Sequence, residues 1–350
     1  MACYAQGDVR DDADSLQPGA QDVLVSFGYD SEGKIGDAGT PSPTHLAYGA
    51  EIGTVWGLAY ARSTQQLYTS ALLKRHAGLL GTNADDLDVI YVTDLSASPA
   101  TNGSFMSLTS AGVDVGKALI AGRPELPNYA SNNSADPVYD LVGKIGIGDI
   151  DISDDDSTLY AINLYNRSLV SIDIGSTSVI TQVTIPEQSC VNGKTRPWAL
   201  HVDKNDIYVG VVCSAEDGGT SSDLTADVLK YDGTSFSTIL SEPIALDYVR
   251  DQINGSLQPA DWLPWSATFT SVVAGSNVIY PQPILSDIEF DVDGSLILGF
   301  MDRNGHQTGN LNADPDGNGT YSGVSGGDLL RMCRKGNTYV LEGTPSCPYN

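Results

Sequence analysis

Four segments of the chain share one pattern, and this internal repeat limits the choice of fold more than any other feature. The segments are "WGLAYARSTQQLYTSALLKRH" from Trp56, "GDIDISDDDSTLYAINLYNRSLVSIDI" from Gly148, "WALHVDKNDIYVGVVCSAEDGG" from Trp198 and "SDIEFDVDGSLILGFMDRNGH" from Ser286. Each contains a short alternating strand, a polar turn and a second strand. A third strand follows in the last three ("SLVSIDI", "ADVLKYD" and "DLLRMCR"). Alternation with period two at this turn spacing excludes amphipathic helices, so the repeat predicts an all-β chain.

The spacing of the repeats predicts a β-propeller. The second and third segments start about 50 residues apart, which is the length of one standard blade, whereas the other starts are about 90 residues apart. Insertions at about 97–138 and 251–283 account for the excess, because both stretches are rich in Gly, Pro, Asn and Ser. We expect residues 1–350 to form a single propeller of about five blades, or six if the long inserted loops hold another sheet. A pair of β-sandwiches is the alternative, and it explains the repeats less well.

The ends of the chain also have strand character. "DVLVSFGYDSEG" and "THLAYGAEIG" supply two N-terminal strands, which we expect to complete or close the ring beside the C-terminal strand "TYVLEG". Helices are expected only as short turns around 72–80 and 245–253.

The charge of the chain excludes several classes of partner. The sequence has 44 Asp and Glu residues against 18 Lys and Arg, which gives a formal net charge of −26. Such a field repels nucleic acid and anionic membranes and favours divalent cations. No apolar run reaches the ~18–20 residues that span a bilayer. We therefore expect neither a nucleic-acid partner nor membrane insertion.

The cysteines indicate an oxidising compartment. Cys190 and Cys213 bracket a strand pair, and Cys333 and Cys347 bracket a terminal hairpin. Read as two disulfides, each pair closes a loop of roughly 15–25 residues and contributes about 3 kcal/mol. Cys3 is left over, and buried free thiols are the alternative. Met1 is followed directly by "ACYAQGDV" without a signal peptide, so we expect a secreted or cell-surface chain that starts after a removed leader, with a cytosolic protein as the alternative.

With the repeats aligned, the chain resembles the propeller-like N-terminal regions of bacterial cell-surface proteins that carry SdrD B-like (Cna B-type) modules downstream. The resemblance is carried by "WGLAYARSTQQLYTSALLKRHAGL", "VGKIGIGDIDISDDDSTLYAINLYNRSL", "RPWALHVDKNDIYVGVVCSAEDGG" and "PILSDIEFDVDGSLILGFMDRNGHQ". It implies a secreted, surface-anchored architecture in which this chain is a monomeric domain of a larger protein. The downstream modules are absent here.

Charged corners follow the second strand of each repeat. In a propeller these corners lie on one face of the ring, so the sequence predicts a charged funnel there. The candidate ligand-binding residues are Lys74, Arg75, His76, Asn166, Arg167, Arg196, Glu216, Asp217, Asp302, Arg303 and His306. Two interpretations stay open: a ligand site, or Arg–carboxylate pairs that hold neighbouring blades together.

A calcium loop is a further candidate. In "NADPDGNGT", Asp314, Asp316 and Asn318 match the start of a loop in which alternate oxygens converge on calcium. Ser325 stands where a bidentate acid is expected, and Asp328 is the substitute ligand.

Three functions follow from these observations. The first is an extracellular binding or adhesion propeller, stabilised by calcium, whose ligand is unknown and for which a glycan is one candidate. The second is a propeller hydrolase or lyase, with His76 or His306 as general base and Arg75 and Arg303 stabilising negative charge. The third is a structural spacer. Common catalytic motifs are missing from the sequence, so no catalytic residue is assigned.

Overall fold

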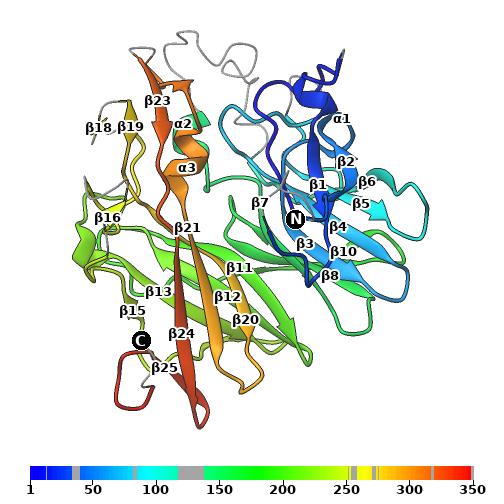
Figure 1. Cartoon of the computed structure of the whole chain (residues 1–350). Coiled ribbons are helices and arrows are strands. Elements are labelled where there is room, and N and C mark those ends of the chain that lie inside the picture. Colours follow the sequence, from blue (N-terminus) through cyan, green and yellow to red (C-terminus); the bar gives the residue numbers. More distant parts are fainter. Residues whose placement is uncertain are drawn as a thin grey trace.

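The computed structural model of the chain describes residues 1–12, 14–33, 40–81, 85–116, 138–250, 252–253, 258–269, 273–274, 276–316 and 319–347. These residues form an all-β propeller whose blades are antiparallel sheets (Figure 1). The fold class predicted from the repeats is therefore confirmed.

Each of the four repeats forms one blade, with its first strand innermost. Blade 1 consists of β3 (Val55–Ala61), β4 (Gln66–Ala71), β5 (Val89–Asp94) and β6 (Thr101–Ser107), and blade 2 of β7 (Ile147–Ile152), β8 (Thr158–Asn163), β9 (Ser168–Asp173) and β10 (Ser178–Thr184). Blade 3 consists of β11 (Thr195–Asp203), β12 (Asp206–Cys213), β13 (Thr225–Tyr231) and β14 (Phe236–Thr238), with β15 (Ile244–Ala245) also paired to β13. Blade 4 consists of β20 (Pro283–Phe290), β21 (Leu296–Asp302), β24 (Asp328–Lys335) and β25 (Thr338–Leu341).

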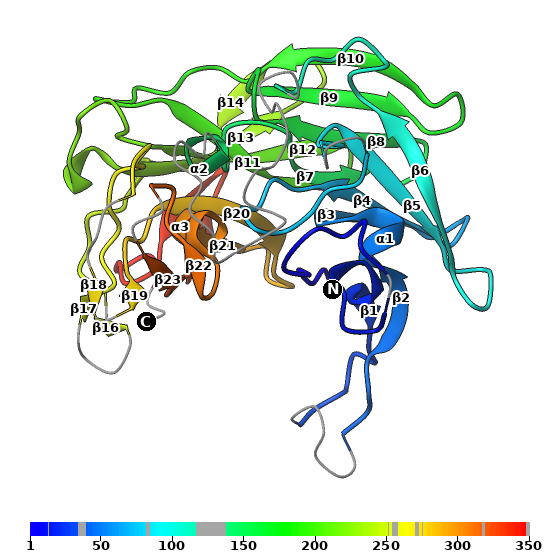
Figure 2. The ribbon, with the colours of Figure 1, turned by 90° about the horizontal axis from the view of Figure 1, so that it is seen from above.

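The blades follow one another around the molecule (Figure 2). The inner strands are neighbours in the order β3, β7, β11 and β20, and no comparably extensive contact joins β20 back to β3 among the described residues. Apolar side chains fill the spaces between blades. Ile150 and Leu159 of blade 2 belong to one buried cluster with Ala59 and Ile90 of blade 1.

The fifth position of the ring is occupied in part. β1 (Asp22–Ser26) and β2 (Thr44–Tyr48) pair with each other. Their buried side chains, including Leu24 and Leu46, pack with Val55 and Val89 of blade 1. The expected closure beside "TYVLEG" is wrong, because that strand is β25 and pairs with β24 inside blade 4.

The helices are short and do not lie where they were expected. They are α1 (Gly49–Ile52), α2 (Val138–Leu141) and α3 (Arg303–Thr308), with 3-10 turns η1 (Pro18–Ala20) and η4 (Ser221–Asp223). The described parts of 72–80 and 245–253 contain no helix, so that expectation is wrong. α3 forms at the end of β21 because the Asp302 carboxylate accepts the Asn304 N–H at its first turn. Gly309, at φ 70°, ends the helix.

The inserted segments contain short strands. β6 lies inside the first predicted insertion, which therefore begins later than residue 97, while residues 117–137 lie outside the described residues. The sequence of β6 resembles a loop because this outermost strand is largely solvent-facing. The other short strands are β16 (Gln252–Ile253), β17 (Gln258–Pro259), β18 (Val273–Ala274), β19 (Asn277–Val278), β22 (Asn312–Ala313) and β23 (Thr320–Gly323).

Two disulfides are present. Cys190 is bonded to Cys213 at the end of β12, and Cys333 of β24 is bonded to Cys347, as the cysteine spacing predicted. Cys3 is a free cysteine. Within the part of the chain that the structure describes, no helix is both long enough and apolar enough to span a bilayer.

Candidate functional site

The structure brings the two charged corners of blades 1 and 4 together. The Arg75 backbone N–H donates to the His306 carbonyl at 3.0 Å, and Lys74 Nζ donates to the Gly305 carbonyl at 2.8 Å. Lys74 also lies 5.3 Å from the centre of the Tyr4 ring. Burial lowers the pKa of Lys74 to about 8. The N-terminal segment and the two corners thus meet at the seam between the first and last blades.

Arg303 at this seam is a packing residue. Its side chain is fully buried and donates to the carbonyls of Val142, Asp140 and Ser266 and to Gln282 Oε1. Burial lowers its pKa to about 10. The guanidinium therefore joins α2, blade 4 and the second inserted segment.

The other residues of these two corners are also held inside the protein. Arg75 donates to the carbonyls of Gln307 and Ala313. Asp302 accepts backbone N–H groups from Gln282, Asn304 and Gly326, and burial raises its pKa to about 7. His306 is buried, and burial followed by the Lys74 charge lowers its pKa well below the usual range. His76 is buried as well.

Charged and polar residues at the corners of blades 2 and 3 form ion pairs and hydrogen bonds with adjacent loops. Glu216 pairs with both Arg196 and Lys144; burial opposes its ionisation, but these two cations outweigh burial and lower its pKa to about 2. Arg167 pairs with Glu187, and Asp217 pairs with Lys194 at 3.0 Å. Asn166 donates to the Asp114 carbonyl at 2.8 Å. This pattern agrees with the interpretation in which charged corners hold segments together.

The proposed calcium ligands are only partly placed. Asp314 accepts the Asp316 N–H within the loop, and Asn318 lies outside the described residues. Asp328 instead accepts the Tyr248 hydroxyl at 2.6 Å and lies 3.4 Å from Arg250. Among the described residues no group of three or more His, Cys, Asp or Glu side chains is arranged to hold a metal ion.

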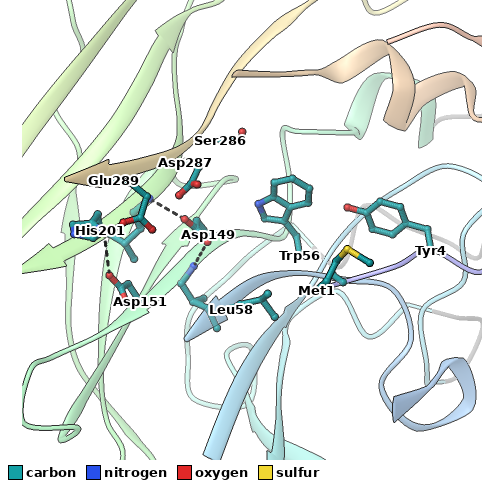
Figure 3. A pocket seen from close by; sticks show the side chains of 13 residues that line it. Met1, Tyr4, Trp56, Leu58, Asp149, Asp151, His201, Ser286, Asp287 and Glu289 are labelled. Carbon is teal, nitrogen blue, oxygen red and sulfur yellow. Dashed lines mark hydrogen bonds and ion pairs between the residues drawn. The ribbon is translucent and has the colours of Figure 1, made fainter. Parts of the chain in front are cut away.

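A cavity lies among the inner strands, at the centre of the ring. Its volume is about 500 Å³. Figure 3 shows acidic side chains on one side and Trp56, Tyr4 and Met1 on the other. The lining residues are Met1, Ala2, Tyr4, Trp56, Leu58, Asp149, Ile150, Asp151, Leu200, His201, Ser286, Asp287 and Glu289.

Two of the carboxylates join blade 2 to blade 3. Asp149 accepts the N–H of Ile150 at 3.0 Å and the N–H of Leu200 in β11 at 3.2 Å. Asp151 accepts the N–H of its neighbour Ile152 at 2.8 Å and that of Val202 in β11 at 2.6 Å. Burial raises the pKa of both carboxyl groups, and for Asp149 the nearby Asp287 adds to the effect.

The other two carboxylates lie on β20 and face the cavity. Asp287 and Glu289 are exposed. His201 Nδ1 lies 3.9 Å from Glu289 and 4.0 Å from Asp151, and burial raises the pKa of Glu289. No Lys or Arg side chain is among the described residues that line this cavity. The site is therefore rich in acceptors and strongly acidic.

Aromatic rings lie between the cavity and the seam. The His306 ring makes edge contacts with Tyr4 at 5.9 Å and Trp56 at 6.0 Å, and Trp56 contacts Trp198 at 6.4 Å. His306 thus contributes to the wall behind the cavity rather than to its lining.

Sequence reasoning missed this central site because it followed the scarce basic residues. The available signal was the pair of inner strands "GDIDI" and "SDIEF", which place acids two residues apart at equivalent positions of two repeats. Acids at alternate positions of a strand share one face.

Comparisons with known proteins give distant relatives. The chain is 27% identical to Colossin-D of Dictyostelium discoideum over 99% of its own length and 33% of that protein, and 25% identical to Colossin-B of the same organism over 99% of this chain and 8% of that protein. The chain thus spans a third or less of these relatives. No family model matches it.

Solved structures are more distant still. The GH43 protein BlXynB of Bacillus licheniformis has a TM-score of 0.38 and 10% identity over 85% of this chain and 46% of that one. The xylan beta-1,4-xylosidase of Bacillus halodurans has a TM-score of 0.37 and 12% identity over 86% of this chain and 48% of that one. Likeness at this level assigns no activity, so the site is interpreted from its own residues.

Proposed function

We propose that this chain is a non-enzymatic binding domain of a secreted protein, and that its ligand places hydrogen-bond donors in the central cavity. The carrying observation is that four carboxylates line the cavity and no Lys or Arg does so among its described lining residues. An ionised carboxylate only accepts hydrogen bonds, so the cavity selects hydroxyl and N–H groups and disfavours anions.

The position of the proposed site fits this role. Asp287 and Glu289 are exposed, whereas the charged corners are occupied by contacts within the protein. Trp56 and Tyr4 offer ring surface opposite the acids (Figure 3). Carbohydrate hydroxyls are therefore one class of ligand to test, with apolar sugar faces against the rings.

The secreted setting is supported by the two disulfides, since disulfides persist in oxidising compartments. The much greater length of the colossins supports the view that such a domain belongs to a larger chain. The resemblance to bacterial surface proteins makes adhesion the biological role that we favour.

A hydrolase is the second candidate, now with a different set of residues. We base this candidate on other residues because Arg303 and His306 of the Arg/His/Asp funnel are buried in contacts within the protein. The central cavity instead combines Asp149, whose pKa is raised by burial, with three further carboxyl groups. Carboxyl groups in contrasting environments can divide the acid and base roles in glycoside hydrolysis.

One experiment separates these functions. A glycan array and a matched hydrolysis assay are run with the wild-type chain, the double variant Asp287→Asn/Glu289→Gln and the control Asp30→Asn, an exposed acid outside the cavity. We expect retention of a glycan or another donor-rich ligand by the wild type and the control, loss of retention in the double variant, and no bond cleavage. Bond cleavage by the wild type that is lost in the double variant would establish the hydrolase. Ligand binding that is equally strong in the wild type and the double variant would overturn the proposed site.

A further inference from the structure

In the part of the chain that the structure describes, blade 4 packs extensively against another blade on one face only. In the ring, β20 lies beside β11, and side chains such as Leu298 and Phe300 belong to the buried cluster shared with blade 3. Among the described residues, no other blade packs as extensively against its opposite face. There, Asp287, Gly299 and Leu329 line a second cavity of about 650 Å³, and Leu329 is 71% exposed. This cavity adjoins the central one, because Trp56, Ser286 and Asp287 line both.

The protein already shows how an inner strand holds its neighbour in the ring. On β7, Asp149 and Asp151 each accept a backbone N–H from β11, and these N–H groups belong to Leu200 and Val202, two residues apart. Donors two residues apart on an extended chain are separated by about 6.6–7 Å, and carboxylates two residues apart on a strand match that spacing. The two carboxylates of β7 thus bind the backbone N–H groups along one edge of an extended chain.

β20 has the same pair of acids at alternate positions. The sequence Asp149–Ile150–Asp151 on β7 corresponds to Asp287–Ile288–Glu289 on β20, and in each blade the first acid lies at a bulge of the inner strand or directly after it. In the described part of the chain, no backbone N–H donates to Asp287 or Glu289, and both acids are exposed. β20 therefore carries the same carboxylate acceptors as β7, but among the described residues no strand lies beside them in the position that β11 takes beside β7.

We propose that the ligand of this protein is an extended peptide segment of a partner, which lies alongside β20. The inference rests on the proposed function and names its ligand class. N–H groups of peptide residues i and i+2 donate to Asp287 and Glu289, as those of Leu200 and Val202 donate to Asp149 and Asp151. Main-chain donors of this kind give affinity, and side-chain pockets give selectivity.

The surroundings add two preferences to the ligand. Trp56 and Leu329 line the open face, so an apolar side chain of the peptide has surface to cover there. The acids lack a Lys or Arg among the described lining residues of either cavity, so a basic side chain near the two donors is favoured.

An array of random heptapeptides tests the proposal. The wild-type chain, Asp287→Asn, Glu289→Gln and the control Asp30→Asn are each applied to it, and the best peptide is then synthesised for calorimetry. We expect each cavity variant to weaken binding about 10-fold, the control to bind as the wild type does, and N-methylation at two residues i and i+2 to abolish binding. N-methylation at the intervening residue should have little effect, because that N–H points away from β20.

The outcomes distinguish the two proposals. If no peptide binds the wild type more strongly than it binds Asp287→Asn and Glu289→Gln, while a glycan or simple amine is retained through Asp287 and Glu289, the peptide inference is overturned and the proposed function stands. If the binding of peptides, glycans and amines is in each case independent of these acids, both the peptide inference and the proposed function are overturned. Peptide binding that tolerates N-methylation at every position would show side-chain recognition alone and would also overturn the inference.

Discussion

At the scale of single residues, burial decides what the scarce basic groups do. Arg303 is fully buried and donates four hydrogen bonds, so its charge stabilises an internal junction. Exposure instead marks Asp287 and Glu289 as groups that a ligand can reach. Residue type alone had left both a ligand site and internal Arg–carboxylate pairs open for the basic residues.

Replacement of Arg303 should be strongly destabilising. Arg303→Ala leaves three buried or partly buried carbonyls without their donor, and we expect a loss of about 3–5 kcal/mol in the free energy of unfolding. Arg303→Lys should recover little, because one ammonium cannot replace the forked guanidinium. Urea denaturation measures the effect. The exposed control Lys194→Ala should change stability by less than about 0.5 kcal/mol, and an equally small change for Arg303→Ala would contradict the assigned role.

The pH dependence of stability should reveal Asp302. Burial raises its pKa to about 7 in the folded protein, above the ordinary value of an aspartic acid side chain. The folded state therefore binds more protons than the unfolded state between these values, and the stabilisation present at low pH is lost as the pH rises towards 7. The wild type should lose stability relative to Asp302→Asn from pH 4 to pH 7 in urea titrations. A difference that does not vary with pH would refute this assignment.

At the scale of elements, each repeat forms one blade as predicted. The differences between prediction and structure lie in the loops and the outer strands. The inner strands were recognisable because apolar alternation reflects their buried contacts. β6 was assigned to an insertion because an outer strand has little to bury, as its exposure pattern shows. α3 was missed because its six residues are fixed by the Asp302 cap and by tertiary contacts, not by helical periodicity.

The disulfides give a prediction at this scale. The Cys190–Cys213 bond closes a loop with a sequence separation of 23, so Cys190→Ser/Cys213→Ser should lower stability by about 3 kcal/mol. Mass spectrometry of the denatured, non-reduced wild type should find one free thiol, at Cys3. Three or five free thiols would disprove the pairing.

Calcium binding by the loop that contains Asp314 and Asp316 stays a prediction. A calcium ion bound only to the folded state stabilises that state by mass action. EDTA should therefore lower the melting temperature, and added calcium should restore it. Asp316→Asn should melt at the lower temperature and respond less to EDTA. A melting curve that EDTA leaves unchanged would rule out a stabilising ion.

At the scale of the whole molecule, the ring is asymmetric. Blade 2 holds blade 3 through carboxylates that accept backbone N–H groups, whereas the equivalent acids of blade 4 accept no backbone N–H among the described residues, and Glu289 lies 3.9 Å from the His201 ring. The N-terminal segment and the hairpin β1–β2 cover blade 1 instead. The open face of blade 4 is a consequence of this incomplete ring.

This asymmetry predicts different costs for two equivalent acids. Asp151→Ala removes the acceptor of the Ile152 and Val202 N–H groups, so we expect a loss of about 1–3 kcal/mol. Glu289→Ala removes no such bond and should change stability by less than about 0.5 kcal/mol. Thermal and urea unfolding compare the two variants, and equal losses would show that Glu289 stabilises the folded state as much as Asp151 does.

The sequence by itself determined the fold class, the first strand of each blade and both disulfides. These features depend on local alternation, on turns and on cysteine spacing, all of which are properties of neighbouring residues. It also predicted that the corners containing Arg75 and Arg303 lie on one face of the ring, because blade topology fixes the end of the ring at which they lie. Only the tertiary structure decided which charges are internally compensated, since burial and partners come from segments far apart in the chain. For the same reason, only the assembled ring distinguishes Asp149, which holds β11, from Asp287, which faces an open cavity.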